Sequence, residues 1–241
     1  MTLTQTQGIL SDRMRCAPIL QAMTDEQYDH FMVVGESIRM RDRKTECFRF
    51  IINDAKDIPE LVCDIADLLH RFIVVDSDSE ENWRMIFPEA EYKQFKMSVN
   101  MRKIPRSVLN KQLPDEIQIV PMDESWDELV IEMSACDEFP AESLKRQLRE
   151  NLSLGLIWQG KRVGFHSKHL NGEMGPLWVS PEVRGKGFGM LLIQEYQQEH
   201  LKESKIAFAL MDIDNHVSIK VTENLGIPIY KKNILQVTTR M

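Results

Sequence analysis

A glycine-rich turn between an apolar strand-like run and an apolar helix-like run is the feature that most constrains what this chain can fold into. The first run ends at Pro181, and the second begins at Met190. Between them stand three alternating glycines, Gly185, Gly187 and Gly189. Glycine lets a backbone turn tightly and approach an anion closely, and the start of a helix favours negative charge. With Arg184 and Lys186 adding positive charge, the pattern predicts a strand, a phosphate-binding turn and a helix in succession.

Two other phosphate-binding patterns do not fit this turn. A P-loop requires Gly-x-x-x-x-Gly-Lys-Ser/Thr, and the chain has no such run. The dinucleotide fingerprint requires Gly-x-Gly-x-x-Gly early in a βαβ unit, whereas here the glycines alternate and further strands are expected before them. An ordinary surface turn before a helix remains as the alternative.

Composition narrows the class of protein. Of the 241 residues, 43% are hydrophobic and 28% are charged, and the net charge is -7. These values are typical of a globular protein of one large or two modest domains, and the acidic balance argues against nucleic acid as a partner. Because no apolar run approaches the roughly 18 residues of a membrane span, no membrane partner is expected either.

The cysteines bear on metal binding, and both they and the first 23 residues bear on where in the cell the protein is found. The four cysteines are scattered without a Cys-x-x-Cys pair, so we expect no metal and a reduced, cytoplasmic setting. The first 23 residues contain Arg13 and Arg15 but a single acid, Asp12, which leaves a mitochondrial transit segment open.

Residues 1–114 predict an N-terminal α/β half. Hydrophobic periodicity predicts helices at residues 24–34, 58–69 and 80–97, and strands at 47–53 and 71–76. The first helix is expected to begin at Thr24, with Gln27 in the capping-box position. The pattern weakens between Lys103 and Pro114, which is the predicted domain boundary.

Residues 115–241 predict a second α/β domain. Strands are expected at residues 117–120, 154–158, 162–166, 173–179 and 207–211 and after 227, and helices at 123–133, 141–151, 188–200 and 214–225. The apolar run at 206–210 is typical of a central strand covered on both faces.

This order of elements, together with the turn, resembles the Gcn5-related N-acetyltransferase superfamily. Its Arg/Gln-x-x-Gly-x-Gly/Ala loop is matched by Arg184, Gly187 and Gly189, and its Asn-x-x-Ala…Leu-Gly-Phe segment is similar to the run from Asn215 to Ile227. The resemblance implies an α/β (α+β) fold with a mixed, mostly antiparallel twisted sheet flanked by helices. Residues 115–241 would be the catalytic domain, and residues 1–114 an additional half that could be a degenerate copy of it.

A narrower resemblance is to the glycine N-acyltransferase-like family. It is carried by the run from Asn171 through Glu173 to Met174, and then by Leu177, Pro181, Glu182 and Arg184. The vertebrate members of that family have an eroded phosphate loop, whereas this chain keeps the full form. The acceptor of that family therefore cannot simply be carried over.

The resemblance implies acetyl-CoA or a longer acyl-CoA as co-substrate, and no metal. The residues expected to contact the coenzyme are Leu177, Trp178, Val179, Arg184, Gly185, Lys186, Gly187, Phe188, Gly189, Asn215 and Ser218. Each has a structural alternative, since Asn215 could cap a helix and Phe188 and Trp178 could pack in a core.

Attack of an amine on a thioester requires removal of a proton from the incoming ammonium. Glu173 resembles the catalytic glutamate of the family and is the candidate general base, with a solvated turn residue as its alternative. His166 and His169 are competing bases, because histidine titrates near neutrality. The tyrosine that often protonates the thiolate in the superfamily is replaced by Thr222, although Tyr196 and Tyr230 remain.

The sequence therefore predicts an enzyme that transfers an acyl group from acyl-CoA to the amine of a small molecule, glycine or another amino acid first among them. One alternative is an acyl-CoA sensor or pseudoenzyme that binds without turnover. Another is a protein lysine or N-terminal acetyltransferase, which is less favoured because no acidic tract is placed to bind basic peptides. The sequence predicts no oligomeric state.

Overall fold

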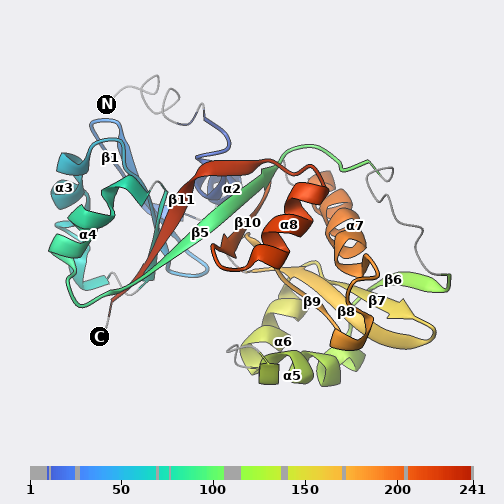
Figure 1. Ribbon diagram of the computed structural model, residues 1–241. Coiled ribbons are helices and arrows are strands. Elements are labelled where there is room, and N and C mark those ends of the chain that lie inside the picture. Colours follow the sequence, from blue (N-terminus) through green and yellow to red (C-terminus); the bar gives the residue numbers. More distant parts are fainter. Residues whose placement is uncertain are drawn as a thin grey trace. The chain divides into compact units, whose positions relative to one another are not determined.

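Figure 1 shows the computed structural model of the chain, which divides into two compact units. The structure describes residues 10, 12–24, 28–68, 71–75, 77–105, 115–136, 141–169, 172–203 and 206–239. The first unit comprises Met1–Val99, Leu210–Ile219 and Ile229–Met241, and the second comprises Asn100–Ala209 and Lys220–Pro228.

The first unit is built on a sheet whose strand order is β1-β2-β3-β4-β11-β5-β10. Only the pairing of β3 with β4 is parallel among the pairings described for β1 to β5 and β11. The strands are β1 (Tyr28–Val34), β2 (Ser37–Asp42), β3 (Phe48–Ile51), β4 (Arg71–Val75), β5 (Glu91–Asn100), β10 (Ala207–Asp212) and β11 (Ile229–Thr238). The helices are α2 (Ala17–Thr24), α3 (Ile58–Val62) and α4 (Glu80–Ile86), with short 3-10 turns at Ala55–Asp57, Ala66–Leu68 and Ser77–Ser79.

The last strand belongs to this first unit. Leu235 of β11 lies opposite Val74 of β4 on one side and Gln94 of β5 on the other. Backbone pairing on both edges makes β11 an interior strand, which explains why residues 229–241 join residues 1–99. The compact units therefore differ from a division of the chain at residue 114.

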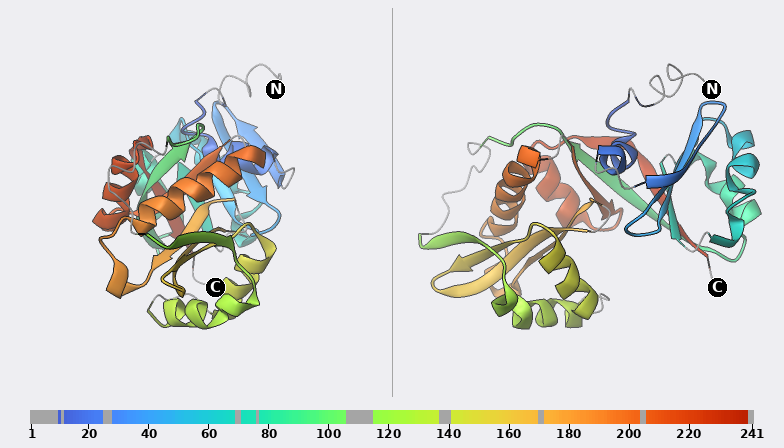
Figure 2. Two further views of the ribbon diagram at one scale, coloured as in Figure 1. Left: turned by 90° about the vertical axis from the view of Figure 1, so that its right-hand side faces the viewer. Right: turned by 180° about the vertical axis from the view of Figure 1, so that it is seen from behind.

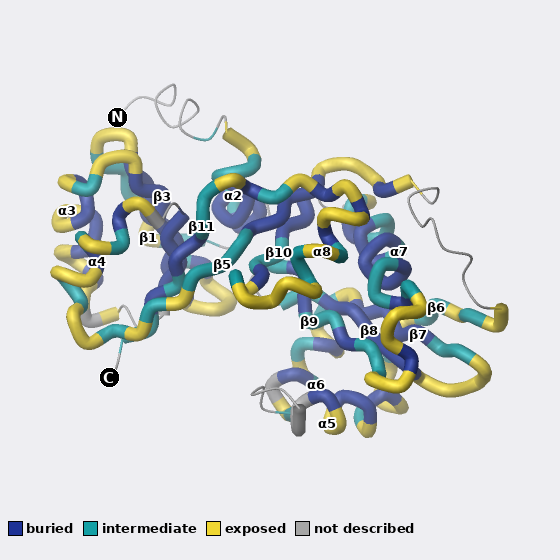
Figure 3. The backbone as a smooth tube through the Cα atoms, viewed as in Figure 1, coloured by how far each residue is buried: buried dark blue, intermediate teal, exposed yellow. Residues whose placement is uncertain are grey.

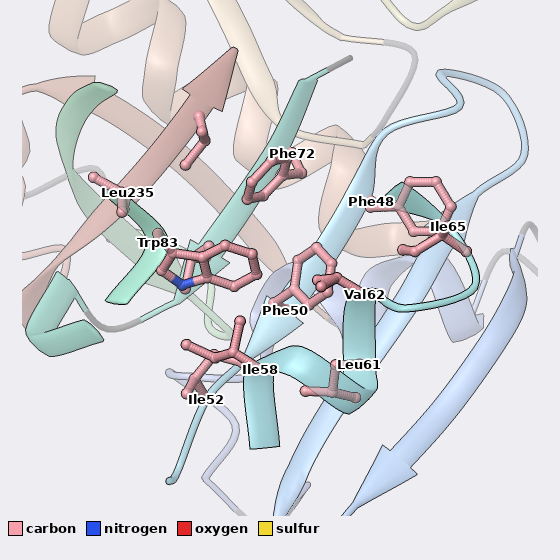
Figure 4. Packing of buried hydrophobic residues seen from close by; sticks show 12 residues of the cluster. Phe48, Phe50, Ile52, Ile58, Leu61, Val62, Ile65, Phe72, Trp83 and Leu235 are labelled. Atoms are coloured by element: carbon pink, nitrogen blue, oxygen red, sulfur yellow. The ribbon is translucent and has the colours of Figure 1, made fainter. Parts of the chain in front are cut away.

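Aromatic side chains form the main core of the first unit. Figure 4 shows the Trp83 ring lying against Phe50 and Phe72, at centroid distances of 5.0 and 4.9 Å. Trp83 is fully buried, and its indole N–H donates to the Ser79 hydroxyl at 3.2 Å. Strand β3, which supplies Phe50, is buried along its whole length (Figure 3). The polar atom of the largest core side chain is thus satisfied inside the core.

A buried ion pair lies on the same sheet. Arg49 of β3 donates from Nη2 to Asp42 Oδ2 at 3.0 Å, and its Nη1 donates to the Pro18 carbonyl of α2. Both charged side chains are almost completely buried. Arg49 therefore links strand β3 to helix α2 through its hydrogen bond to the Pro18 carbonyl.

The second unit contains a four-stranded antiparallel sheet in the order β6-β7-β8-β9. The strands are β6 (Ile117–Pro121), β7 (Leu154–Trp158), β8 (Lys161–Lys168) and β9 (Met174–Val179). The helices are α5 (Asp127–Cys136), α6 (Ala141–Glu150), α7 (Phe188–Glu203) and the last part of α8 (His216–Asn224), with 3-10 turns at Glu124–Trp126 and Pro181–Val183. In Figure 2, α7 (orange) covers one face of this sheet, and α5 and α6 (green) cover the other.

Side-chain alternation along β9 explains the two layers of the second unit. Leu177 and Val179 pack toward α7, whereas Trp178 packs with Phe165 under α5 and α6. The sheet of this unit therefore separates two apolar cores.

Most elements predicted for the second half of the chain are confirmed, but two predictions for the first half are wrong. Residues 28–34 form strand β1 instead of the helix expected at 24–34, because Met32 and Val34 alternate onto the core and the strand pairs with β2. Residues 91–97 belong to strand β5 and not to the helix expected at 80–97. Pro88 disfavours helical backbone at Phe87, and α4 ends at Ile86.

Other outcomes in the first half are mixed. The strands expected at 47–53 and 71–76 are confirmed as β3 and β4, whereas the helix expected at 58–69 is shorter, because α3 ends at Val62 and a 3-10 turn follows at Ala66–Leu68. Gln27 of the proposed capping box lies outside the described residues.

Candidate functional site

The glycine-rich turn joins the end of β9 to the start of α7, as the sequence predicts. Ser180 donates its backbone N–H to the Val163 carbonyl at 2.9 Å, which fixes the exit from the strand. Gly185 and Gly187 have φ angles of +80° and +91°. Side chains other than hydrogen are disfavoured there, so two of the three glycines are required by the backbone.

Apolar side chains anchor the turn in the core of the second unit. Phe188 is 1% exposed and packs with Leu156, Val183 and Leu192. Its ring meets Trp158 edge to face at 5.5 Å. The side chain of Phe188 therefore belongs to the core, and only its backbone is available to a ligand.

Positive charge and backbone amides gather at the surface of the turn. Arg184 is exposed, and its Nε donates to the Val179 carbonyl at 2.9 Å. Lys186 is also exposed, with Nζ 5.2 Å from the centre of the Trp158 ring. The N–H of Leu191 bonds the Gly187 carbonyl at 3.1 Å, so the amides of the preceding helical turn have no acceptor within α7. This arrangement suits a phosphate.

The first turn of α7 packs directly on β9. A Cβ built on Gly189 would lie 3.8 Å from Leu177 Cδ2 and 3.9 Å from Val179 Cγ2. Trp178 is buried and stacks on Phe165 at 6.1 Å. The structure thus brings residues 177–179 and 184–189 together in the second unit, as the sequence predicts.

Asn215 and Ser218 belong to the first unit. The Asn215 Oδ1 accepts the backbone N–H of Ser218 at 3.1 Å, so Asn215 caps helix α8. The structural alternative named for Asn215 is therefore realised. A contact of either residue with a coenzyme stays a prediction.

A bulge interrupts β9 just before Leu177. His166 lies opposite Leu177 and Lys168 lies opposite Met174, so Gly175 and Pro176 together oppose a single residue of β8. Gly175 has a φ of +146°, and the Gly175–Pro176 peptide is cis. The bulge changes the direction of the backbone at the entry to the strand that leads into the turn.

Glu173 lies at the hairpin between β8 and β9. The backbone N–H of His169 donates to the backbone carbonyl of Glu173 at 2.7 Å, and the backbone N–H of Gly172 donates to the backbone carbonyl of His169 at 2.9 Å. Gly172 has a φ of +82°, which is typical of a hairpin that closes with a glycine bulge. Glu173 is half-buried. Asn171, which the sequence places in this turn, lies outside the described residues.

The two competing histidines differ in how far they are buried. His166 is 3% exposed, and its Nδ1 lies 3.1 Å from the Pro176 carbonyl. Burial lowers the pKa of His166 from 6.5 to about 4, so at neutral pH the ring is uncharged and Nδ1 donates to that carbonyl. His169 is half-buried, and its Nδ1 lies 3.1 Å from Gln147 Oε1. His166 is therefore a core residue, whereas His169 remains near the surface.

Gln147 is a contact that the sequence reasoning missed. It lies on α6, and its Nε2 donates to the Gly175 carbonyl at 3.2 Å. A glutamine on an amphipathic helix gives no signal of such a contact.

The two tyrosines considered as proton donors, Tyr196 and Tyr230, are both buried. The buried Tyr196 hydroxyl donates to the Leu152 carbonyl at 3.2 Å, and Tyr230 and Thr222 are also buried.

Across the residues that the structure describes, no group of three His, Cys, Asp or Glu side chains could hold a metal ion. No helix in the described part of the chain is both long and apolar enough to cross a membrane.

Comparisons with known proteins agree with this geometry. Residues 158–235 match the family model for FR47-like protein. A GCN5-related N-acetyltransferase from Kribbella flavida is similar in structure, with a TM-score of 0.59 at 10% identity, over 95% of each chain. A GCN5-related N-acetyltransferase-like protein from Streptococcus suis gives a TM-score of 0.57 at 12% identity, over 98% of this chain and 99% of that one. No curated protein matches the chain. The chain therefore has the fold of the GCN5-related N-acetyltransferases, and its part from residue 158 to 235 matches the FR47-like family.

Proposed function

We propose that the protein transfers an acyl group from acetyl-CoA or a longer acyl-CoA to the amine of a small molecule, with glycine and other amino acids as the first acceptors to test. The observation that carries the proposal is the turn between β9 and α7. Two left-handed glycines, exposed Arg184 and Lys186, and the start of a long helix form a phosphate cradle on the end of a strand. The fold of the neighbouring structures supports acyl-CoA as the phosphate ligand.

In this proposal the coenzyme lies along β9 and enters the turn with its pyrophosphate. Backbone N–H groups of residues 178–179 are candidates to bind the thioester oxygen as charge develops on it. Arg184 and Lys186 neutralise phosphate charge, and Asn215 and Ser218 are further candidate contacts.

Glu173 is the proposed general base. The amine nitrogen attacks the thioester carbon, a C–N bond forms, and the C–S bond breaks. Glu173 takes one proton from the ammonium before the attack. After the attack the nitrogen loses a second proton, which passes through water to the departing thiolate of the coenzyme. His166 is not a suitable base, because its side chain is buried in the core, out of reach of an incoming amine.

A thiol-release assay tests the proposal. Purified protein is incubated with a panel of acyl-CoA thioesters against a panel of amino acids and other amines, and the thiol released is measured. We expect release above the uncatalysed rate for at least one pair. Release with none of the pairs contradicts the enzymatic proposal.

Calorimetry separates binding from turnover. Gly187→Glu places a carboxylate beside the proposed pyrophosphate, so we expect it to abolish coenzyme binding. Glu173→Gln should keep binding and lose turnover. Unchanged binding in the first variant contradicts the phosphate contact, and full activity in the second removes only the assigned base.

A binding protein without turnover is the second candidate. The observation that favours it is Thr222, which is buried where the superfamily often has a tyrosine. Tight coenzyme binding in calorimetry together with no thiol release from any amine would identify such a sensor.

A further inference from the structure

The carbonyl of Val179 points to the open edge of β9. The N–H of Ser180 donates to the Val163 carbonyl of β8 at 2.9 Å. In a planar trans peptide, the C=O of one residue and the N–H of the next point in opposite directions, so the Val179 oxygen points away from β8. Strand β9 is the last in the order β6-β7-β8-β9. The oxygen therefore lies at the edge of β9 that pairs with no other strand of this sheet.

The side chain of Arg184 covers this oxygen. Its Nε donates to the Val179 carbonyl at 2.9 Å, which brings the exposed side chain back against the strand that the backbone has just left. The acid beside it is engaged elsewhere, since the Ser180 hydroxyl donates to Glu182 Oε2 at 2.6 Å. That bond is the main cause of the lowered pKa of Glu182, and the charge of Arg184 contributes least. The guanidinium is thus held by a neutral carbonyl.

A phosphate in the glycine-rich turn would be a stronger partner for the guanidinium. A hydrogen bond between two charged groups is shorter and stronger than one to a neutral acceptor. Arg184 directly precedes Gly185, the first left-handed glycine of the turn, so a phosphate bound by the turn lies next to it along the chain. Movement of the guanidinium to that phosphate uncovers the Val179 oxygen.

The uncovered oxygen suits the pantetheine arm of coenzyme A. This arm carries two secondary amides, and the amide N–H groups of an extended ligand pair with the carbonyls of a strand edge. In the ligand-free protein, the guanidinium lies on the edge carbonyl nearest to the turn. It therefore stands in the path of an arm that runs along β9 from the turn.

We propose that Arg184 makes binding of the pantetheine arm depend on the pyrophosphate, so that the acyl donor is a thioester of coenzyme A and not one of pantetheine alone. Without a pyrophosphate, Arg184 stays on Val179 and excludes the arm. With a pyrophosphate, the guanidinium moves to the phosphate, and the arm binds the released carbonyl. This inference rests on the proposed function and assigns the donor specificity within it.

The main test compares coenzyme A with pantetheine, which has the arm but no phosphate, in Arg184→Met. Loss of a hydrogen bond between charged groups should weaken coenzyme A binding by about 10- to 100-fold. Loss of the competing side chain should strengthen pantetheine binding by about 2- to 10-fold. Calorimetry measures the first affinity, and an NMR titration measures the second. A variant that binds pantetheine no better than the wild type overturns the inference.

Lys186→Met is the matched control. It also removes one exposed positive charge from the turn, but the contact described for Lys186 is with Trp158, whose ring centre lies 5.2 Å from Nζ. We expect this variant to weaken coenzyme A binding and to leave pantetheine affinity unchanged. An equal gain in pantetheine affinity in both variants would assign the gain to the net charge, and would overturn the inference.

A coupling measurement uses the wild type alone and so does not depend on how a variant folds. Inorganic pyrophosphate should draw Arg184 from Val179 and thereby strengthen pantetheine binding by about 2- to 10-fold. Pantetheine should strengthen pyrophosphate binding by the same factor. Independent binding of the two, in a protein that binds coenzyme A, overturns the inference alone. Failure of the wild type to bind coenzyme A overturns the proposed function, and the donor specificity with it.

Discussion

The two units differ in how their cores are built. In the first unit, the Trp83 ring lies against Phe50 and Phe72, and the buried Arg49 is paired with Asp42. In the second unit, a four-stranded sheet has an apolar core on each face, and Phe188 anchors the glycine-rich turn in one of them. That unit also holds the left-handed glycines of the turn and the bulge in β9.

This difference teaches which local features each unit depends on. The first unit depends on a core packed around one indole. The second depends, at the turn and the hairpin, on backbone conformations that glycine adopts more easily than other residues. Four changes test this contrast.

Removal of the central indole should have the largest effect. Trp83→Ala leaves a cavity among Phe50 and Phe72, so we expect the free energy of unfolding to fall by about 3–5 kcal/mol. Urea denaturation measures this loss. Met85→Ala on the same helix is the control, since Met85 is 74% exposed and its truncation should change stability by about 0.5 kcal/mol or less. Similar losses in the two variants would contradict the packing role of the first unit.

Lowering the pH should destabilise the protein through His166, the buried neutral histidine of the second unit. The pKa of His166 is about 4 in the folded protein and 6.5 as its ordinary value. Between these values the unfolded chain binds more protons, so stability falls as pH falls, by about 3 kcal/mol in total. Urea denaturation from pH 7.5 to pH 4 measures the slope, and His166→Gln should remove this part of it. A slope that is the same in the variant would show that other groups cause it.

A methyl group on β7 should clash with the covering 3-10 turn. A Cβ on Gly155 would lie 2.2 Å from Cζ2 of Trp126. Gly155→Ala therefore forces the indole to move, and we expect a loss of about 1–3 kcal/mol. Thermal unfolding measures it, and an unchanged melting temperature would mean that Trp126 can move at no cost.

The smallest effects on stability separate two glycines of the turn. Gly187→Ala adds a side chain at a φ of +91°, which should cost about 1 kcal/mol and weaken coenzyme binding. Gly189→Ala meets Leu177 at an ordinary 3.8 Å and should change stability by less than about 0.5 kcal/mol, with coenzyme affinity retained. For both variants, calorimetry measures coenzyme affinity and urea denaturation measures stability. Equal binding losses would show that a methyl at position 189 also obstructs the ligand.

The sequence was sufficient to predict the local structure of the turn and of the elements on either side of it. The turn could be recognised because Gly185 and Gly187 are needed for its backbone, and the strand and helix on either side have clear periodicity. The alternating order of the second unit was predictable for the same reason.

Non-local contacts were beyond such reasoning. The helix expected at 80–97 is cut short after α4, and the following residues pair as β5 with β11, a strand far along the chain. Gln147 contacts Gly175 and His169 only because α6 packs on the hairpin. Neither pairing leaves a pattern in the residues themselves, since tertiary contacts override local propensity.

The interior position of β11 sets an order for synthesis. Strands β4 and β5 leave the ribosome long before residues 229–238, and at about 5–20 residues per second the delay is roughly ten seconds. Until then, the facing edges of β4 and β5 have exposed N–H and C=O groups that another chain could pair with. The sheet of the first unit therefore cannot be completed until the last of its strands has been synthesised.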